Sequence, residues 1–271
     1  WVPDLLTMDK VGAWAITEPG SGSDAFGSMK STARKDGDEY VLNGSKTFIT
    51  NGPYADTIVF IAKLDEGNDP KDRKVLSFVL DAGTPGLVQS KPLRKMGMHS
   101  SPTGELFLED VFVPDDPANP GESGVIGNVN EGWRVAMSTA SNERGLSLRS
   151  PGRFLATVDR LLELYKSSGR TDDSALRNQV ADAWIGARAY QLNTFGTVTR
   201  LADGGQLGAE SSINKVFWSE WDIATHETAL ELQGPEAELA DNWMDGYLFS
   251  LSGPIYAGTN EIQKNVIAER L

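Results

Sequence analysis

The distribution of hydrophobic and polar residues divides the chain into two parts. Up to about residue 113, short apolar runs are separated by Asp36-Gly37, Asn43-Gly44 and Asn51-Gly52. Asp-Gly and Asn-Gly are the strongest short-range signals of a β-hairpin turn. This pattern predicts an antiparallel β-sandwich or barrel. The expected strands are 30–35, 39–42, 46–50, 57–64, 75–80, 86–92 and 105–113.

Beyond residue 130, apolar residues recur at spacings of three and four, which is the pattern of amphipathic helices. Breaks at Gly169, Gly204-Gly205 and Gly234-Pro235 leave expected helices at 131–166, 172–203, 209–232 and 260–271. Residues 114–127 are rich in Pro, Gly and Asp and predict a linker. We therefore expect an α+β protein, with an antiparallel β domain and linker at 1–127 and a C-terminal helical bundle at 128–271.

A glycine- and serine-rich segment follows the first apolar run, at residues 14–24. Residues 20–25 (GSGSDA) fit the dinucleotide fingerprint G-x-G-x-x-G/A, which must open a helix. Residues 26–37 instead predict a strand that ends at Asp36-Gly37, so a Rossmann site is excluded. No Gly-Lys-Ser/Thr occurs here, which excludes a P-loop. Two interpretations remain: an anion-binding loop, or a connection that binds nothing, which is the commoner case.

The composition narrows the classes of partner. The chain has 271 residues, 39% of them hydrophobic and 23% charged, which is typical of a globular protein with room for two domains. The net charge is −13 and basic residues do not cluster, which argues against nucleic acid and anionic membrane surfaces as partners. No apolar run is long enough for a membrane span and no signal peptide is visible. We expect a soluble, cytoplasmic protein.

Several kinds of site are excluded by residue type. The chain has no cysteine, so disulfides, thiolate metal sites and thiol nucleophiles are excluded. Neither His99 nor His226 belongs to a set with metal-ligand spacing or to a Ser/His/Asp arrangement, and we interpret both as structural or surface histidines. The chain begins at Trp1 rather than at Met, so we expect a fragment or a processed form of a longer chain.

A candidate general base lies on the first expected helix. Trp133, Ala136, Met137 and Ala140 form an apolar stripe, and the same spacing continues to Glu143 and Arg144. This pattern predicts that Glu143 faces the buried side, where desolvation raises the pKa of a carboxyl toward that of a useful base. The alternative is a simple ion pair, and the pattern supports both interpretations equally.

Near the end of the chain, residues 253–263 form a Gly/Pro turn that leads into a helix, with Thr259 or Asn260 as its N-cap. Helix N-termini present free amide donors, so this turn is a candidate anion or cofactor contact. The alternative is an ordinary capped terminal helix.

Four segments together resemble the acyl-CoA dehydrogenases: residues 16–24 (ITEPGSGSD), 40–52 (YVLNGSKTFITNG), 104–114 (GELFLEDVFVP) and 256–263 (YAGTNEIQ). They occur in the family's order and with family-like separations, and the similarity extends from about residue 13 to the C-terminus. The order of β and helical parts is also that of the family's middle and C-terminal domains. The family's N-terminal helical domain is missing from this chain.

The resemblance implies a cofactor and a reaction. The cofactor is FAD, and the substrate is an acyl-CoA thioester. A base takes the α-proton while the β-hydrogen leaves as hydride to flavin N5, which gives a trans-2-enoyl-CoA. The resemblance further implies a role in fatty acid degradation, an electron-transferring flavoprotein as acceptor, and a homo- or hetero-oligomer.

Matching positions imply the cofactor contacts of the β domain. Thr17 and Thr50 would hydrogen-bond the flavin ring, with Thr50 near N5. Ser23 would lie by the pyrophosphate or the thioester tail of the substrate. Phe48 stands where many members have a Trp packed on the flavin, so an aromatic ring is retained there.

The helical part matches the family less closely. Thr259 and Glu261 would contact FAD at the capped helix. Members usually have an Arg followed by a Phe-Gly motif that reaches the FAD of a neighbouring subunit, but here Arg170 precedes Thr-Asp-Asp-Ser. Glu231 replaces a Gln in the next cofactor motif. The resemblance therefore assigns Arg170 and Glu231 to the adenosine end of FAD, and the changes suggest a different pairing of subunits.

One position departs sharply from the family. Many members carry their catalytic Glu immediately before Gly-Thr, where this chain has Ala257. A minority branch, the isovaleryl- and long-chain-type enzymes, carries the base on the first helix of the C-terminal domain, just before an Arg. Glu143 and Arg144 stand at that place, which implies Glu143 as the base and Arg144 near the CoA moiety. The Ala257 N–H would polarise the thioester carbonyl, and Tyr256 would border the substrate pocket.

Two other functions remain open. The altered cofactor motifs and Ala257 suggest a non-catalytic flavin-binding or structural subunit of a heteromeric acyl-CoA dehydrogenase. The same scaffold also suits a flavin oxidase or monooxygenase.

Overall fold

The computed structural model describes residues 1–116, 123–129, 131–146 and 150–270, with the backbone alone for residues 140–146. The chain divides into two compact units. The first comprises Trp1–Lys95 and His99–Thr139, and the second comprises Met96–Met98 and Ala140–Leu271.

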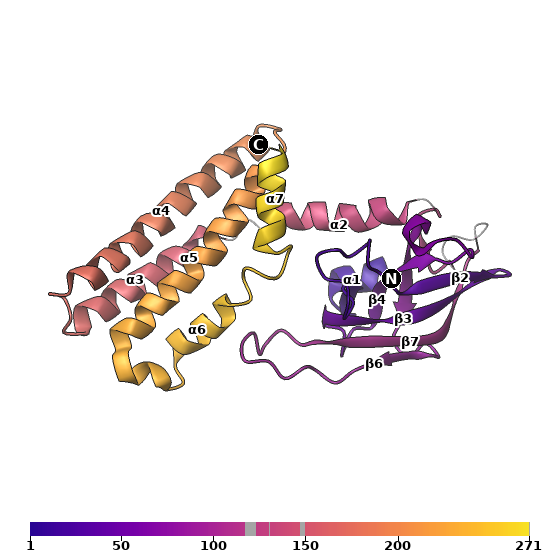
Figure 1. Ribbon diagram of the computed structural model, residues 1–271, viewed down its shortest axis with the longest axis horizontal. Coiled ribbons are helices and arrows are strands. Elements are labelled where there is room, and N and C mark those ends of the chain that lie inside the picture. Colours follow the sequence, from indigo (N-terminus) through magenta and orange to yellow (C-terminus); the bar gives the residue numbers. More distant parts are fainter. Residues whose placement is uncertain (117–122, 130, 147–149, 271) are drawn as a thin grey trace. The chain divides into compact units, whose positions relative to one another are not determined.

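The first unit is built on a mixed sheet (Figure 1). The strand order is β6-β7-β3-β2-β4-β5-β8, and β1 pairs with β4 at the side. Strands β1 and β2 run parallel to β4, and the other pairs are antiparallel. The elements are α1 (Val2–Thr7), β1 (Gly12–Ala15), β2 (Thr32–Asp36), β3 (Glu39–Thr50), β4 (Thr57–Leu64), a 3-10 turn (Pro70–Asp72), β5 (Val75–Asp81), β6 (Leu87–Gln89), β7 (Thr103–Pro114) and β8 (Val125–Ile126).

The core of the sheet contains fully buried aromatic and aliphatic side chains. Phe60, Phe78 and Leu106 have no exposed surface, and the Tyr40 ring packs edge-on against Phe78 at 5.4 Å between centroids. Alternating residues of β7 point into this core, as expected for a strand with one solvated face. The expected architecture of a β domain followed by a helical domain is confirmed.

The expected turn at Asn43-Gly44 is wrong, because the chain continues straight through it as one long strand. Strand β3 pairs with β7 on both sides of this point. The Asn43 amide is used across the sheet instead: its Nδ2 donates to Asp110 Oδ1 at 3.0 Å, and its Oδ1 accepts from Asp110 N at 3.0 Å. A Cβ on Gly44 would lie 2.8 Å from Ser31 Cα, so glycine is needed for close approach rather than for a turn. The Asp36-Gly37 turn does form, with Asp36 opposite Glu39.

The second unit is helical. Its elements in Figure 1 are α2 (Gly132–Leu146), which begins in the first unit, α3 (Pro151–Ser167), α4 (Ser174–Ala202), α5 (Glu210–Gln233), a 3-10 turn (Gly234–Glu238), α6 (Asn242–Ser250) and α7 (Asn260–Arg270). Helices α3, α4 and α5 lie side by side around Phe154. The Phe154 ring lies 4.8 Å from Tyr190 and 5.1 Å from Trp221.

Some helices differ from expectation, among them α1 (Val2–Thr7), which was not expected. The helix expected at 131–166 is divided into α2 and α3, because Pro151 supplies no N–H and begins a new helix capped by Ser150. The Ser150 hydroxyl accepts from Gly152 N at 3.3 Å. Helix α6 was not expected, although its N-cap Asp241 accepts from Trp243 N and Met244 N at 2.9 and 2.8 Å.

We found no helix in the described part of the chain that is both long enough and apolar enough to cross a bilayer.

Candidate functional site

The segment after β1 forms a compact loop without a following helix. Residues 22–28 are turns and bends, and the chain then runs through 29–31 into β2, so a strand and not a helix follows this segment, as expected. Glu18 and Ser21 exchange backbone hydrogen bonds of 3.1 and 3.0 Å, and the Ser21 hydroxyl donates to Asp24 O at 2.7 Å. These contacts leave Ser23 exposed on the loop.

A buried ion pair anchors this loop, and the sequence analysis missed it. Lys46 on β3 is fully buried, and its Nζ lies 2.8 Å from Glu18 Oε1. Burial lowers the pKa of Lys46 to about 8, although Glu18 opposes the shift. Burial raises the pKa of Glu18, but Lys46 and hydrogen bonds from Lys46, Ser31 and Lys30 outweigh it and hold that pKa below its usual range.

The ring of Phe48 stands on a bulge of β3. Between Lys46 and Ile49 the strand has one residue more than its partner β7. Phe48 sits there at φ 56°, in the left-handed region that bulky residues avoid, and its side chain is 68% exposed. Backbone strain and an exposed aromatic ring at one position favour a ligand site over a purely structural role.

Two threonines flank this ring. Thr50 is exposed two residues beyond Phe48, and Thr17 lies beside the bulge because Thr47 N donates to Thr17 O at 2.9 Å. Among the described residues, no side-chain hydrogen bond uses the hydroxyl of Thr17 or of Thr50. The structure thus brings together Thr17, Phe48 and Thr50, the three residues of the first unit that the family resemblance assigns to the flavin ring.

The turn before α7 also presents an unengaged backbone donor. Ala257 has φ 54° and Gly258 has φ 81°, so two successive residues are left-handed. Among the backbone hydrogen bonds of the described residues, none uses the Ala257 N–H as donor. Gln263 Nε2 donates to Ala257 O at 3.1 Å and holds the peptide from its other side. This geometry suits an amide that donates to a ligand oxygen.

Thr259 caps α7, as the sequence analysis proposed for Thr259 or Asn260. Its hydroxyl accepts from Ile262 N at 3.3 Å. The pKa of the Glu261 carboxyl is held below its usual range by a backbone N–H of α7 and by the Thr259 hydroxyl. Tyr256 is half-buried, with its ring 6.1 Å from that of Trp218.

The side chain of Asn260, next to the cap residue Thr259, belongs to a polar cluster between α5 and α7. Its Oδ1 accepts from Lys215 Nζ at 2.8 Å and from the Ser219 hydroxyl at 3.1 Å. Lys215 is buried, and this burial lowers the pKa of Lys215 to about 8 despite Glu261 and Glu220. The cluster fixes α7, and with it the turn at Ala257, on α5.

The structure brings Arg170 and Glu231 together. Arg170 Nη1 donates to Glu231 O at 2.7 Å, and its Nη2 lies 3.2 Å from Asp173 Oδ2. Glu231 Oε2 accepts from Gln179 Nε2 at 3.4 Å. Both residues are thus engaged within the helical unit, and their assignment to the adenosine end stays a prediction.

Glu143 and Arg144 lie on α2, but their side chains are outside the described residues. In the apolar stripe that predicted their orientation, Ala136 is buried, whereas Trp133 is 51% exposed. The Trp133 and Phe26 ring centroids lie 3.9 Å apart. The inward orientation of Glu143 stays a prediction.

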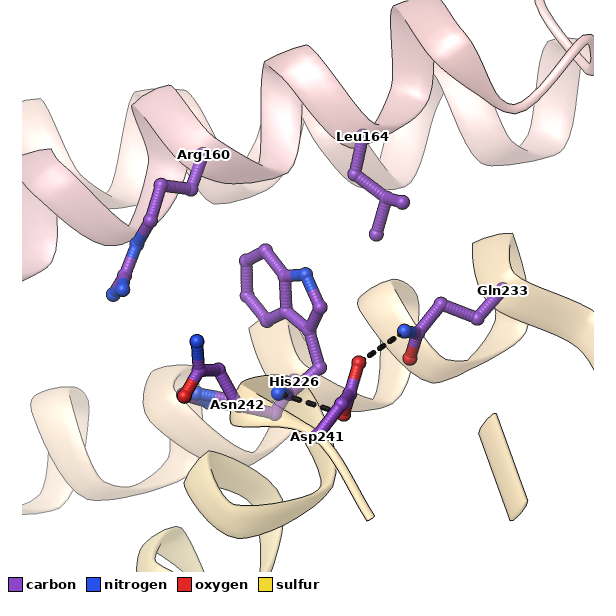
Figure 2. Close-up of a pocket in the computed structure, with 7 residues that line it drawn as sticks. Arg160, Leu164, His226, Gln233, Asp241 and Asn242 are labelled. Carbon is purple, nitrogen blue, oxygen red and sulfur yellow. Dashed lines mark hydrogen bonds between the residues drawn. The ribbon is translucent and has the colours of Figure 1, made fainter. Parts of the chain in front are cut away.

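A cavity of about 320 Å³ lies between α3, α5 and α6 (Figure 2). Asp241 lies between Gln233 and the first turn of α6, and it accepts hydrogen bonds from the Gln233 side chain and from Trp243 N. His226 is buried here: its Nδ1 lies 2.7 Å from Asp222 O, and because a carbonyl oxygen only accepts, Nδ1 is the donor of this hydrogen bond. The seven lining residues are Arg160, Leu164, His226, Gln233, Asp241, Asn242 and Trp243, and none belongs to the predicted cofactor contacts.

Two family models match the chain. Residues 13–111 match the acyl-CoA dehydrogenase middle domain, and residues 130–271 match the acyl-CoA dehydrogenase C-terminal domain.

Curated relatives align over the whole chain. A 3-(aryl)acrylate reductase of Clostridium sporogenes (strain ATCC 15579) is 32% identical, and this chain covers 71% of it. The acyl-CoA dehydrogenase IpdE1 of Mycobacterium tuberculosis (strain ATCC 25618 / H37Rv) is 30% identical, with 69% covered.

Solved structures show the same fold over 99% of the chain. An acyl-CoA dehydrogenase from Geobacillus kaustophilus has a TM-score of 0.85 and 29% identity, with 70% of it covered. The prolyl acyl carrier protein oxidase AnaB has a TM-score of 0.83 and 27% identity, with 70% covered. An FAD complex of PigA has a TM-score of 0.83 and 26% identity, with 69% covered.

Proposed function

Because the chain belongs to the acyl-CoA dehydrogenase family, we propose that it catalyses the FAD-dependent α,β-dehydrogenation of an acyl-CoA thioester. Its relatives are a reductase and dehydrogenases, so the chain is an oxidoreductase. The observation that carries the proposal is the exposed ring of Phe48 on a strained bulge of β3, with Thr17 hydrogen-bonded beside the bulge and Thr50 exposed two residues beyond it.

FAD is the cofactor, as in the FAD complex of the related PigA. The residues of the first unit fit it, because an exposed aromatic face suits the flat flavin ring and unengaged threonine hydroxyls suit its polar edge. Ser23 is exposed and suits the pyrophosphate or the thioester tail. In the second unit, we assign Thr259, Glu261 and Arg170 to further FAD contacts. When bound, FAD accepts the hydride that leaves the β-carbon, at flavin N5.

The chain's own residues supply the proton chemistry. The Glu143 carboxylate takes the α-proton of the acyl group, and the Ala257 N–H donates to the thioester carbonyl. A donor at that carbonyl stabilises the negative charge that develops as the α-proton leaves. The α-proton and β-hydride leave together, so the acyl group becomes a trans-2-enoyl thioester. We assign Arg144, Ser23 and Tyr256 to substrate binding, and an electron-transferring flavoprotein to the reoxidation step.

The visible spectrum of the purified chain tests this function. We expect a flavin spectrum that is bleached under anaerobic conditions by at least one member of a panel of acyl-CoA thioesters. A flavin that no thioester bleaches would contradict the reaction and favour a non-catalytic subunit.

The similarity to the oxidase AnaB supports one competing function, that of a flavin oxidase. After bleaching, we expect slow reoxidation by air and rapid reoxidation by an electron-transferring flavoprotein. Rapid reoxidation by oxygen alone would assign the chain to the oxidases instead.

We further propose that the chain is an oligomer, because α4 exposes an apolar face. Ile185, Leu192 and Phe195 are 57%, 71% and 54% exposed, and their spacing places them on one side of the helix. A second copy of the chain is the simplest cover for this face. Sedimentation equilibrium should report a mass above that of one chain, and Leu192→Asp should lower it. A wild-type monomer at micromolar concentration would contradict the proposal.

A further inference from the structure

Glu18 is the point at which both ends of the Gly/Ser loop are fastened. Its carboxylate accepts from Lys30 N at 2.7 Å and from Ser31 N at 3.0 Å, at the end of the loop. Glu18 itself stands at the start of the loop and is only 5% exposed. The Glu18 side chain therefore joins the two ends of the loop, which are thirteen residues apart in sequence.

Lys46 fastens the same side chain to the sheet. Its Nζ donates to Glu18 Oε1 at 2.8 Å and to Ile16 O at 3.2 Å. The ammonium lies 5.0 Å from the centroid of the Phe60 ring in the core. The hydrogen bonds of Lys46 thus connect the loop to the buried face of β3.

Both partners adjoin the groups that face the cofactor. Thr17 directly precedes Glu18, and the bulge with Phe48 begins directly after Lys46. The hydrogen bond from Thr47 N to Thr17 O, at 2.9 Å, joins the two segments. A shift of either charged side chain would therefore move Thr17 and Phe48 relative to each other.

Fold stability alone does not account for a pair of this kind. Taking two charges out of water is costly, and an apolar pair of similar volume is often as stable or more so. An ion pair does, however, define direction and distance, because each of its hydrogen bonds has a narrow geometry. In this pair, Glu18 Oε1 accepts from Lys46 Nζ and Ser31 N, and Oε2 accepts from Lys30 N.

We propose that Glu18 and Lys46 are positioning residues for the flavin ring, which set the placement of Thr17 against the Phe48 bulge. This inference rests on the proposed FAD site and assigns no contact between either residue and FAD.

The test compares FAD binding by the 271-residue chain in four variants. These are Glu18→Gln, Lys46→Met, the double variant, and Asp65→Asn as a matched control. Asp65 pairs with Arg73 at 2.8 Å in the same unit but outside the loop. FAD affinity is measured by quenching of flavin fluorescence on titration of the apoprotein, and the visible absorption maximum of the bound flavin is recorded.

We expect the Glu18→Gln, Lys46→Met and double variants to bind FAD about tenfold more weakly for each hydrogen bond lost. Each should also shift the absorption maximum of the bound flavin. Asp65→Asn should change neither measurement. The double variant decides between positioning and stability, because it leaves no unpaired buried charge and should fold even if the single variants do not. It should recover its urea midpoint but not its flavin affinity or spectrum.

Recovery of both affinity and spectrum in the double variant would overturn the inference and leave the pair a stabilising element. Failure of the wild-type apoprotein to bind FAD would contradict the proposed function itself, and would remove the basis of this inference with it.

Discussion

Replacing Glu143 by glutamine should leave the flavin bound and lower the rate of its reduction by acyl-CoA about 10²- to 10⁴-fold. Glutamine has nearly the same shape but cannot accept the α-proton at neutral pH. Ala257, at the position where many members have their base, offers no side chain to replace it. Stopped-flow measurement of anaerobic flavin bleaching gives the rate directly, and the absorption of the oxidised enzyme shows whether FAD is retained.

Glu163→Gln provides the matched control, because Glu163 is an exposed carboxylate on the neighbouring helix α3. It should bleach at the wild-type rate. Bleaching of Glu143→Gln at that same rate would remove Glu143 from the mechanism and return the search for the base to other residues.

Replacing Gly132 by alanine should destabilise the chain by about 1–3 kcal/mol and lower the rate of flavin reduction. Gly132 is the first residue of α2, and a Cβ there would meet the carbonyl of Val75 and lie 2.7 Å from Leu76 Cα. These are backbone atoms of β5 that cannot rotate away, so the first turn of α2 must move. The same helix carries Glu143, and misplacement of a catalytic group by about 1 Å can cost about 100-fold in rate.

Gly196→Ala on α4 is the matched control, because, apart from the adjoining residues and backbone of α4 itself, no heavy atom of the described residues lies within 4 Å of the Cβ it would add. It should stabilise the chain by about 0.5–1 kcal/mol, since alanine favours the helix. Urea unfolding measures both variants. A Gly132→Ala variant as stable as the wild type would show that α2 does not rest on β5 as described.

Elements that depend on local pattern were predictable. The strand expected at 57–64 is β4 (Thr57–Leu64), and the helix expected at 172–203 is α4 (Ser174–Ala202). Both are long periodic segments bounded by turn or capping residues, so neighbours along the chain suffice to define them. Asn43-Gly44 does not form the expected turn, because its turn propensity is overridden by pairing with β7, where Asn43 contacts Asp110, 67 residues away in sequence.

The candidate site likewise combines residues that could be assigned from the sequence with features that depend on the tertiary structure. Thr17, Phe48, Thr50, Ala257 and Thr259 were assigned from motifs, since residue type and order are local information. The left-handed backbone of Phe48 and the unengaged amide of Ala257 could not be assigned in that way, because both depend on the path of the surrounding chain.

The sequence by itself determined a β part followed by a helical part, because hydrophobic periodicity is a property of neighbouring residues along the chain. The flavin-dependent chemistry was implied by the resemblance of four motifs to those of a known family. Only the tertiary structure decided that Lys46 is buried against Glu18. A lysine in a strand is normally expected to be exposed to solvent. Lys46 is buried because a loop from another part of the sequence folds over it, and the residue type alone does not indicate such a contact.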